Sequence, residues 1–430
     1  MMRYLTQVKT YLDRLKQNPI VQNTIWLLIS KGISLVMQAA YFVTIARTLG
    51  VAKYGEFVSL TALVAIVSPF VGLGIEVLLV KNVAKNRALF SIYWGNSLLI
   101  TLLTGVGFTI VLELLAPIIL NQSISQVAIL LVAASDLIFG SVTTIAGRAF
   151  QSVDRLNISA RISVIAMLTK VIAAFTLMKF FPNPSGLEWI YLYCTSTIIS
   201  AIISASLVQR LLGSPRLELP RIKSELTEGL AFSISTSAYT IYNDIDKTML
   251  SKMSTLSATG IYAAAYRLID VSFIPVISIA GATYAEFFRR GKDGVGAALA
   301  FAKPLVAITA AYSLVAGAGL VLLSPIVPHI LGDEYLPVVA ALRWLAPIPL
   351  FRAMQHFGGD ILSGAGFQAW RSTLEAGIAG FNVAINLWLI PLYSWQGAAW
   401  SSLASDGLLM IMLWSMVAFL YYKQNSKLPD

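Results

Sequence analysis

Residues Ser233–Asp270 read SISTSAYTIYNDIDKTMLSKMSTLSATGIYAAAYRLID, two apolar helical stretches that carry charge and are joined by a short polar turn. The second stretch holds Arg267 and Asp270 one helical turn apart. Placing a charged side chain at the centre of a bilayer costs at least about 2.5–3.5 kcal/mol. We therefore expect these charged residues to face a bundle interior or a wet cavity. Polar side chains of the first stretch recur at steps of three or four residues and so share one helix face: Ser233, Ser237, Thr240, Asp244 and Lys247.

The composition is that of an integral membrane protein. Of 430 residues, 57% are hydrophobic and 12% are charged, whereas soluble domains carry about 25% charged residues. At about 20 residues per span plus short loops, the length accommodates about a dozen helices. We predict an all-α polytopic fold of twelve spans, near residues 20–46, 54–80, 91–115, 124–147, 157–181, 188–211, 226–250, 260–288, 300–324, 336–358, 371–391 and 395–422.

Lysine and arginine set the predicted orientation. They concentrate in the amino-terminal segment and in every second connection, while the opposite loops carry few of them. We therefore expect both termini to be cytoplasmic, with residues 1–17 as a retained amphipathic leader. The net charge of +10 lies in these loops, so topology explains it and no nucleic-acid partner is expected. The basic residues of the predicted cytoplasmic side include Arg3, Lys9, Arg14, Lys16, Lys81, Lys85, Arg148, Arg155, Arg216, Arg221, Lys223, Arg289, Arg290, Lys292 and Lys423.

The sequence repeats weakly over about half its length. Tyr54-Gly55 opens the second span, and Gly260-Ile261-Tyr262 opens the eighth. Six helices repeated in one orientation are related by an axis along the membrane normal. We predict a six-helix lobe over residues 1–212, a cytoplasmic linker over 213–225 and a second six-helix lobe over 226–430, around a central cavity.

Four basic residues within predicted spans are candidates for binding an anionic substrate: Lys31, Arg267, Lys170 and Arg352. Lys31 lies near mid-depth of the first span, and either meets an anion or pairs with a carboxylate of a neighbouring helix. Arg267 can bind a phosphate through two parallel hydrogen bonds. Asp270, one turn later, offers the alternative that it simply neutralises Arg267.

Four carboxylates are candidates for ion coupling or gating: Asp136, Asp244, Asp270 and Asp406. Asp136 and Asp406 fall near mid-depth of their spans, where a carboxyl without a partner favours its protonated form and can carry a proton. Hydrogen bonding between helices is the alternative. For Asp244, with Asp246 and Lys247 beside it, the simpler interpretation is a salt-bridge cluster near the outer end of the span.

An ordered series of short motifs runs over nearly the whole chain: Ala46-Arg47-Thr48-Leu49-Gly50 with Tyr54-Gly55, Gly72-Leu73-Gly74, Asp244-Ile245-Asp246-Lys247, Gly260-Ile261-Tyr262 through Arg267, Ile330-Leu331-Gly332-Asp333-Glu334-Tyr335 and Gly397-Ala398-Ala399. In this series the chain resembles the lipid-linked oligosaccharide flippases, the polysaccharide-transporter branch of the multidrug/oligosaccharidyl-lipid/polysaccharide exporter superfamily. The resemblance implies two six-helix bundles facing a cationic cavity.

The resemblance also implies a substrate, an undecaprenyl pyrophosphate that carries a sugar repeat unit and moves to the periplasmic leaflet. Family members use basic residues in the first and eighth helices for the pyrophosphate, and Lys31 and Arg267 occupy those places. Twelve spans and a lysine in the first helix favour an O-antigen, capsule or exopolysaccharide unit over a peptidoglycan precursor. Membrane lipids, a polysaccharide polymerase and a chain-length protein are the implied partners.

Two other classes remain open. A multidrug cation antiporter of the same superfamily would need a lumen dominated by carboxylates. A membrane-embedded polysaccharide polymerase or glycosyltransferase would need a long outer loop with catalytic residues, and the predicted outer loops are short. We therefore expect a transporter and not an enzyme. One cysteine and two histidines leave no basis for a disulfide or a zinc site. No cofactor is expected, apart from proton or sodium coupling.

Overall fold

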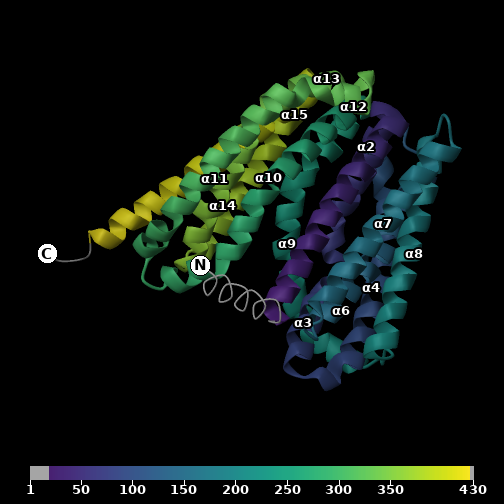
Figure 1. Cartoon of the computed structure of the whole chain (residues 1–430), viewed down its shortest axis with the longest axis horizontal. Coiled ribbons are helices and arrows are strands. Elements are labelled where there is room, and N and C mark those ends of the chain that lie inside the picture. Colours follow the sequence, from purple (N-terminus) through teal and green to yellow (C-terminus); the bar gives the residue numbers. More distant parts are fainter. Residues whose placement is uncertain (1–18, 427–430) are drawn as a thin grey trace, which may run out of the picture. The chain divides into compact units, whose positions relative to one another are not determined.

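The computed structural model describes the backbone of residues 19–426 and, within it, the side chains of residues 32–218, 220, 227–230, 232–234, 237, 240–424 and 426. Every described element is a helix, and no strand occurs in this range (Figure 1). By their packing the residues form two compact units. Unit 1 holds residues up to Thr48, Leu63–Pro117 and Ser123–Ser237, and unit 2 holds Leu49–Ala62, Ile118–Gln122 and Ala238 onward. The predicted lobe boundaries at 212 and 226 stay predictions.

Unit 1 is built from helices of the first half of the chain. Within it α7 packs against α6 and α8, and the π-helical turn η3 also packs on α8. The elements that lie wholly or largely in this unit are η1 (Ser68–Gly74), α3 (Ile75–Lys85), η2 (Arg87–Leu89), α4 (Phe90–Ile119), α5 (Gln126–Ala133), η3 (Ala134–Gly140), α6 (Ser141–Gln151), α7 (Leu156–Phe180) and α8 (Gly186–Leu212). Two long helices, α2 (Pro19–Val67) and α9 (Leu219–Met253), contribute to both units.

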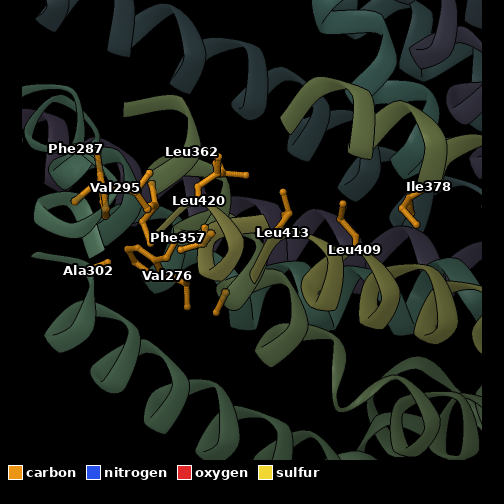
Figure 2. Packing of buried hydrophobic residues seen from close by; sticks show 14 of the residues in the cluster. Val276, Phe287, Val295, Ala302, Phe357, Leu362, Ile378, Leu409, Leu413 and Leu420 are labelled. Carbon is orange, nitrogen blue, oxygen red and sulfur yellow. The ribbon is translucent and has the colours of Figure 1, made fainter. Parts of the chain in front are cut away.

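In unit 2, α14 is the central helix and packs against α10, α11 and α15. The core between these helices gathers Phe287, Val295, Phe357, Leu362 and Leu420 at one end of α14 (Figure 2). The elements of this unit are α10 (Leu256–Gly291), α11 (Val295–Leu323), η4 (Ser324–Ile326), α12 (Val327–Leu331), η5 (Asp333–Tyr335), α13 (Pro337–Leu345), α14 (Ile348–Gly364) and α15 (Gln368–Asn425).

The two longest helices are interrupted. Gly50 breaks α2 with φ 73° and ψ 172°, and Ser394 breaks α15 with φ 54° and ψ −133°. Both interruptions fall in predicted gaps between spans, at 47–53 and 392–394. The left-handed φ at Gly50 suits glycine, because a Cβ there is disfavoured. α15 therefore covers the predicted spans 371–391 and 395–422, whereas α2 covers the span 20–46 and only the first part of the span 54–80.

Among the described residues, eight helices are long and apolar enough to cross a membrane, or nine if the bent pair Asp333–Leu345 and Ile348–Gly364 forms one span. The chain is thus a multi-pass, all-helical membrane protein, as its composition predicts. The count of twelve stays a prediction. Two of the eight are interrupted as described above, and α9 is not among them.

Close helix packing in unit 2 depends on a pair of glycines, Gly291 at the end of α10 and Gly364 at the end of α14. A Cβ on Gly291 would lie 2.2 Å from the carbonyl atoms of Gly364, and one on Gly364 would lie 2.4 Å from the carbonyl oxygen of Phe287. Small residues allow this backbone approach, which drives helix association where lipid is as apolar as the protein.

We predict that Gly291→Ala lowers the free energy of unfolding by about 2–3 kcal/mol, because the added methyl group forces α10 and α14 apart. Gly281→Ala in the same helix is the matched control, since a Cβ there meets nothing within 4 Å. Unfolding by dodecyl sulfate in mixed micelles, followed by tryptophan fluorescence, measures the difference. Equal midpoints for the two variants would contradict the prediction.

Candidate functional site

Arg352 of α14 holds two carboxylates from other helices of unit 2. Its Nη1 lies 3.3 Å from Oδ1 of Asp270 in α10, and its Nε lies 3.5 Å from Oδ2 of Asp406 in α15. The Arg352 side chain is 16% exposed and that of Asp406 is 2% exposed, whereas that of Asp270 is 51% exposed. Arginine suits this position because its guanidinium directs several donors into one plane. The guanidinium therefore contacts the buried carboxylate of Asp406 through Nε and the half-exposed carboxylate of Asp270 through Nη1.

The buried carboxylate Asp406 has further hydrogen bonds. Tyr242 Oη of α9 donates to its Oδ1 over 2.6 Å. Gln355 Nε2, one turn after Arg352, donates to the Asp406 main-chain oxygen over 2.7 Å and to Oδ1 over 3.2 Å. A buried charge is tolerated only when it is both paired and hydrogen-bonded. Asp406 meets both conditions, which fixes the positions of α9, α14 and α15 around it.

A second charged group in unit 2 lies at the end of α9. Lys247 Nζ is 2.6 Å from Asp244 Oδ1 and donates to the main-chain oxygen of Asn243 over 3.2 Å. Asp246 is 5% exposed and accepts a hydrogen bond from Tyr262 Oη. The salt bridge expected between Asp244 and Lys247 is therefore present.

The ring of Tyr266 links these two groups. Its centroid lies 4.6 Å from that of Tyr262, 5.4 Å from Arg352 Cζ and 5.9 Å from Lys247 Nζ. Cations above an aromatic face are attracted by its quadrupole. We call the whole set the unit 2 polar cluster, which comprises Tyr242, Asp244, Asp246, Lys247, Tyr262, Tyr266, Asp270, Arg352 and Asp406.

Unit 1 has a smaller counterpart on three helical elements. Lys170 Nζ of α7 donates to Tyr193 Oη of α8 over 3.1 Å, and Tyr193 Oη donates to Asp136 Oδ1 of η3 over 2.6 Å. The Lys170 Nζ also lies 4.6 Å from the centroid of the Tyr193 ring. The π-helical turn that carries Asp136 is a rare conformation that is frequent at functional sites. The hydroxyl of Tyr193 thus connects the Lys170 ammonium and the Asp136 carboxylate through two hydrogen bonds.

We predict that Tyr193→Phe lowers the free energy of unfolding by about 1–2 kcal/mol, because the half-buried Asp136 and Lys170 both lose the hydroxyl of the buried Tyr193 as a hydrogen-bond partner. Tyr191→Phe is the matched control, since Tyr191 is 54% exposed on the same helix. Mixed-micelle unfolding compares the two. A loss as small as that of the control would mean that these two hydrogen bonds contribute nothing to stability.

The structure brings together some of the predicted site residues. Arg352, Asp270 and Asp406 meet directly, as do Lys170 and Asp136 through Tyr193. Asp270 forms an ion pair with Arg352, 82 residues later in the sequence. Arg267 lies half-buried in α10, one turn before Asp270. Lys31 is in α2, and its side chain lies outside the described residues.

The sequence analysis did not identify Gln355 or the tyrosines of the two polar groups as site residues. These tyrosines are Tyr193, Tyr242, Tyr262 and Tyr266. Tyrosine in an apolar helix is read as an interface anchor or as core, and its hydroxyl gives no periodic signal. It also missed Arg371 at the start of α15, whose Nη1 lies 3.2 Å from Asp360 Oδ1 and whose Nε lies 2.8 Å from Glu375 Oε1. A mid-span tyrosine near a mid-span carboxylate is the signal that points to such contacts.

The described residues offer hydrogen-bonding and ionic groups rather than metal ligands. No group of three or more His, Cys, Asp or Glu side chains among them is placed to hold a metal ion. The arrangement can hold anions on its arginine and lysine side chains, and protons or monovalent cations on its carboxylates.

Comparison with known proteins gives one family match and several solved structures with a similar fold. The sequence profile of a family described as "Polysaccharide biosynthesis protein" matches residues 20–287. Comparison with curated protein sequences found no match. The fold is similar to that of the lipid II flippase MurJ in an inward closed conformation, with a TM-score of 0.74 at 11% identity over 95% of this chain and 94% of that one.

Two further solved structures share this fold. An inward-facing multidrug resistance MATE family transporter of the MOP superfamily has a TM-score of 0.71 at 14% identity, over 92% of this chain and 99% of that one. A MOP superfamily transporter from Pyrococcus furiosus has a TM-score of 0.61 at 14% identity, over 95% and 98%. At these identities the likeness concerns the fold. It confirms the predicted fold class, since the described residues are all-helical and fold like these solved structures.

Proposed function

We propose that this chain, which belongs to the polysaccharide biosynthesis protein family, is a flippase for an undecaprenyl-pyrophosphate-linked oligosaccharide repeat unit. It carries the unit from the cytoplasmic to the periplasmic leaflet of the inner membrane by alternating access, for O-antigen, capsule or exopolysaccharide synthesis. The chain is a multi-pass membrane protein with a flippase-like transporter fold. The specific substrate, the membrane and the cytoplasmic position of both termini are parts of the proposal.

The observation that carries the proposal is the ion pair between Arg352 and a half-exposed carboxylate, Asp270. Arg352 is mostly buried, but its Nη1 faces a carboxylate, Asp270, that is 51% exposed. A phosphate oxygen, like a carboxylate oxygen, is an anionic acceptor that arginine binds through charge-assisted hydrogen bonds. It can therefore replace Asp270 on Arg352 without exposing the deeper pair with Asp406. A half-exposed partner on a buried arginine is a suitable entry point for a diphosphate.

The proposed roles follow from charge. Lys31, Arg267, Lys170 and Arg352 bind the diphosphate, because attraction between opposite charges strengthens where water is scarce. Asp136, Asp244, Asp270 and Asp406 take up a proton or a sodium ion, or release a cation when the substrate leaves. The polyprenyl tail stays in the lipid, which a polar binding site cannot accommodate. No catalytic residue is needed for this movement.

The partners that we propose are membrane lipids, the lipid-linked glycan and, through the finished glycan, a polysaccharide polymerase with its chain-length protein. The experiment that tests the proposal removes the protein from cells that make the glycan. Lipid-linked repeat units should then accumulate on the cytoplasmic face and resist an added periplasmic glycosidase. Units that remain accessible to the glycosidase would contradict the proposal.

A multidrug cation antiporter is the second candidate, and one observation favours it. The unit 2 polar cluster holds four acidic and two basic side chains, so acidic groups outnumber basic ones. Carboxylates suit a lipophilic cation. Efflux of ethidium from cells that overproduce the protein distinguishes the two functions: the flippase predicts no change, and the antiporter predicts faster efflux.

A further inference from the structure

Arg371, at the start of α15, belongs to a charged group of unit 2 that the transport model does not use. Its Nη1 donates to Asp360 Oδ1 over 3.2 Å and to Ser363 Oγ over 3.3 Å, both on α14. The Asp360 side chain is only 5% exposed. A Cβ on Gly359 would lie 2.8 Å from both Cζ and Nε of Arg371, so the guanidinium lies directly against the backbone of α14. These contacts fix the position of the guanidinium.

The opposite edge of this guanidinium, formed by Nε and Nη2, is only half used. Nε donates to Glu375 Oε1 over 2.8 Å, whereas Nη2 forms no hydrogen bond to any residue that the structure describes. The N–H groups of this edge point the same way and suit an anion that presents two oxygens. Glu375 therefore satisfies one donor of an edge that can hold an anion through two. We call Arg371, Asp360, Ser363 and Glu375 the Arg371 site.

The pair between Arg371 and Glu375 is a weak one. Glu375 lies four residues after Arg371 in the same helix, and its side chain is 44% exposed. Exposed ion pairs at this spacing add little to stability, because water already solvates the carboxylate. Glu375 can therefore turn into solvent and leave the edge to another anion, while Asp360 stays on Nη1.

The Arg371 site lies at a membrane surface. α15 is among the described helices that are long and apolar enough to cross a membrane, and Arg371 is in its first turn. Trp370, next to Arg371, is 53% exposed, and exposed tryptophans at the ends of membrane helices lie at the level of the lipid headgroups. Gly366 in the preceding turn has φ 87°, and a Cβ there would meet nothing within 4 Å. The approach to the site is therefore open at the depth where phospholipid phosphates lie.

We propose that the Nε–Nη2 edge of Arg371 binds the phosphodiester group of an anionic phospholipid such as phosphatidylglycerol. The phosphate replaces Glu375 and accepts two parallel hydrogen bonds where the carboxylate accepts one. Asp360 and Ser363 hold the guanidinium in place during the exchange. The bound lipid stays in its own leaflet and is not transported, so the site does not depend on the proposed function.

The test measures lipid binding by the purified full-length protein in dodecyl maltoside micelles. Phosphatidylglycerol is added in steps, and native mass spectrometry counts the lipid molecules that stay bound, which gives a Kd. Glu375→Gln removes the competing charge and should lower the Kd several-fold, an effect that a merely structural role of Glu375 does not predict. Asp293→Asn, at an exposed position in the turn after α10, is the matched control and should leave the Kd unchanged.

A second variant removes the binding edge itself. Arg371→Gln combined with Asp360→Asn leaves no buried charge unmatched and should raise the Kd about tenfold, the effect of losing a hydrogen bond from a charged group. Arg289→Gln combined with Asp293→Asn makes the same two changes at exposed positions and should leave the Kd unchanged. If the Arg371 variant does not fold, Glu375→Gln alone decides.

Inorganic phosphate at the concentration of the lipid should not displace phosphatidylglycerol, because it lacks the acyl chains that hold a lipid at this depth. Displacement by inorganic phosphate would show a site for a soluble anion and overturn the assignment to a lipid. An unchanged or higher Kd in Glu375→Gln, or a wild-type Kd in the folded Arg371 variant, would also overturn the proposal.

Discussion

Replacing Arg352 by methionine is expected to lower the free energy of unfolding by about 3–5 kcal/mol, the largest stability effect that we predict for a single substitution. The substitution leaves Asp406, whose side chain is 2% exposed, without its cation. A buried charge without its partner is then left in the folded protein, which destabilises it. Unfolding in mixed micelles of dodecyl sulfate measures the loss.

Two variants make this prediction specific. Arg343→Met replaces an exposed arginine of α13 and should have little effect. Arg352→Met combined with Asp406→Asn should recover most of the lost stability, because asparagine removes the unmatched charge and still accepts the hydrogen bond from Tyr242. If the double variant is less stable than Arg352→Met alone, the pair with Asp406 is not the reason that Arg352 matters.

Replacing Lys31 and Arg267 together by glutamine should lower the flipping rate of the lipid-linked unit about 100-fold. Each lost contact to a phosphate contributes about tenfold, and glutamine removes the charge while keeping the side chain polar. Purified protein in liposomes with a fluorescent lipid-linked oligosaccharide measures the rate, after the variant is shown to be monodisperse. Lys303→Gln in α11, an exposed lysine, is the control and should flip at the wild-type rate.

A double variant that retains half of the wild-type flipping rate would remove Lys31 and Arg267 from the binding of the diphosphate. That result would not contradict the proposed flippase function. Lys170 and Arg352 would then be the basic residues left to bind the pyrophosphate.

The sequence predicts local features of this protein well. Apolar runs and loop charges identify a polytopic helical protein, and the spacing of Asp244 and Lys247, three residues apart, predicts their salt bridge. The break at Gly50 is also foreseeable, because glycine between two apolar runs tolerates a left-handed φ. The predicted span 371–391 ends at Pro391. The helix instead continues past it and breaks at Ser394, since proline can be accommodated inside membrane helices.

Contacts between helices that are distant in sequence could not be predicted from the sequence. Helical periodicity fixes which face carries a charge, but not which helix meets that face. The pair Arg352 and Asp270 spans 82 residues and that of Tyr193 and Asp136 spans 57. Their formation depends on how each helix is rotated and on the π-helical turn at Asp136, which no propensity rule predicts.

Transbilayer movement of the lipid-linked oligosaccharide in liposomes that contain only this protein tests the central claim most directly. A fluorescent undecaprenyl-pyrophosphate-linked repeat unit, loaded in both leaflets, is quenched from outside with dithionite. We predict that wild-type protein makes nearly the whole pool accessible to the quencher, whereas protein-free liposomes protect the inner half. A protected half that persists with folded wild-type protein, with or without a proton or sodium gradient, would contradict the claim.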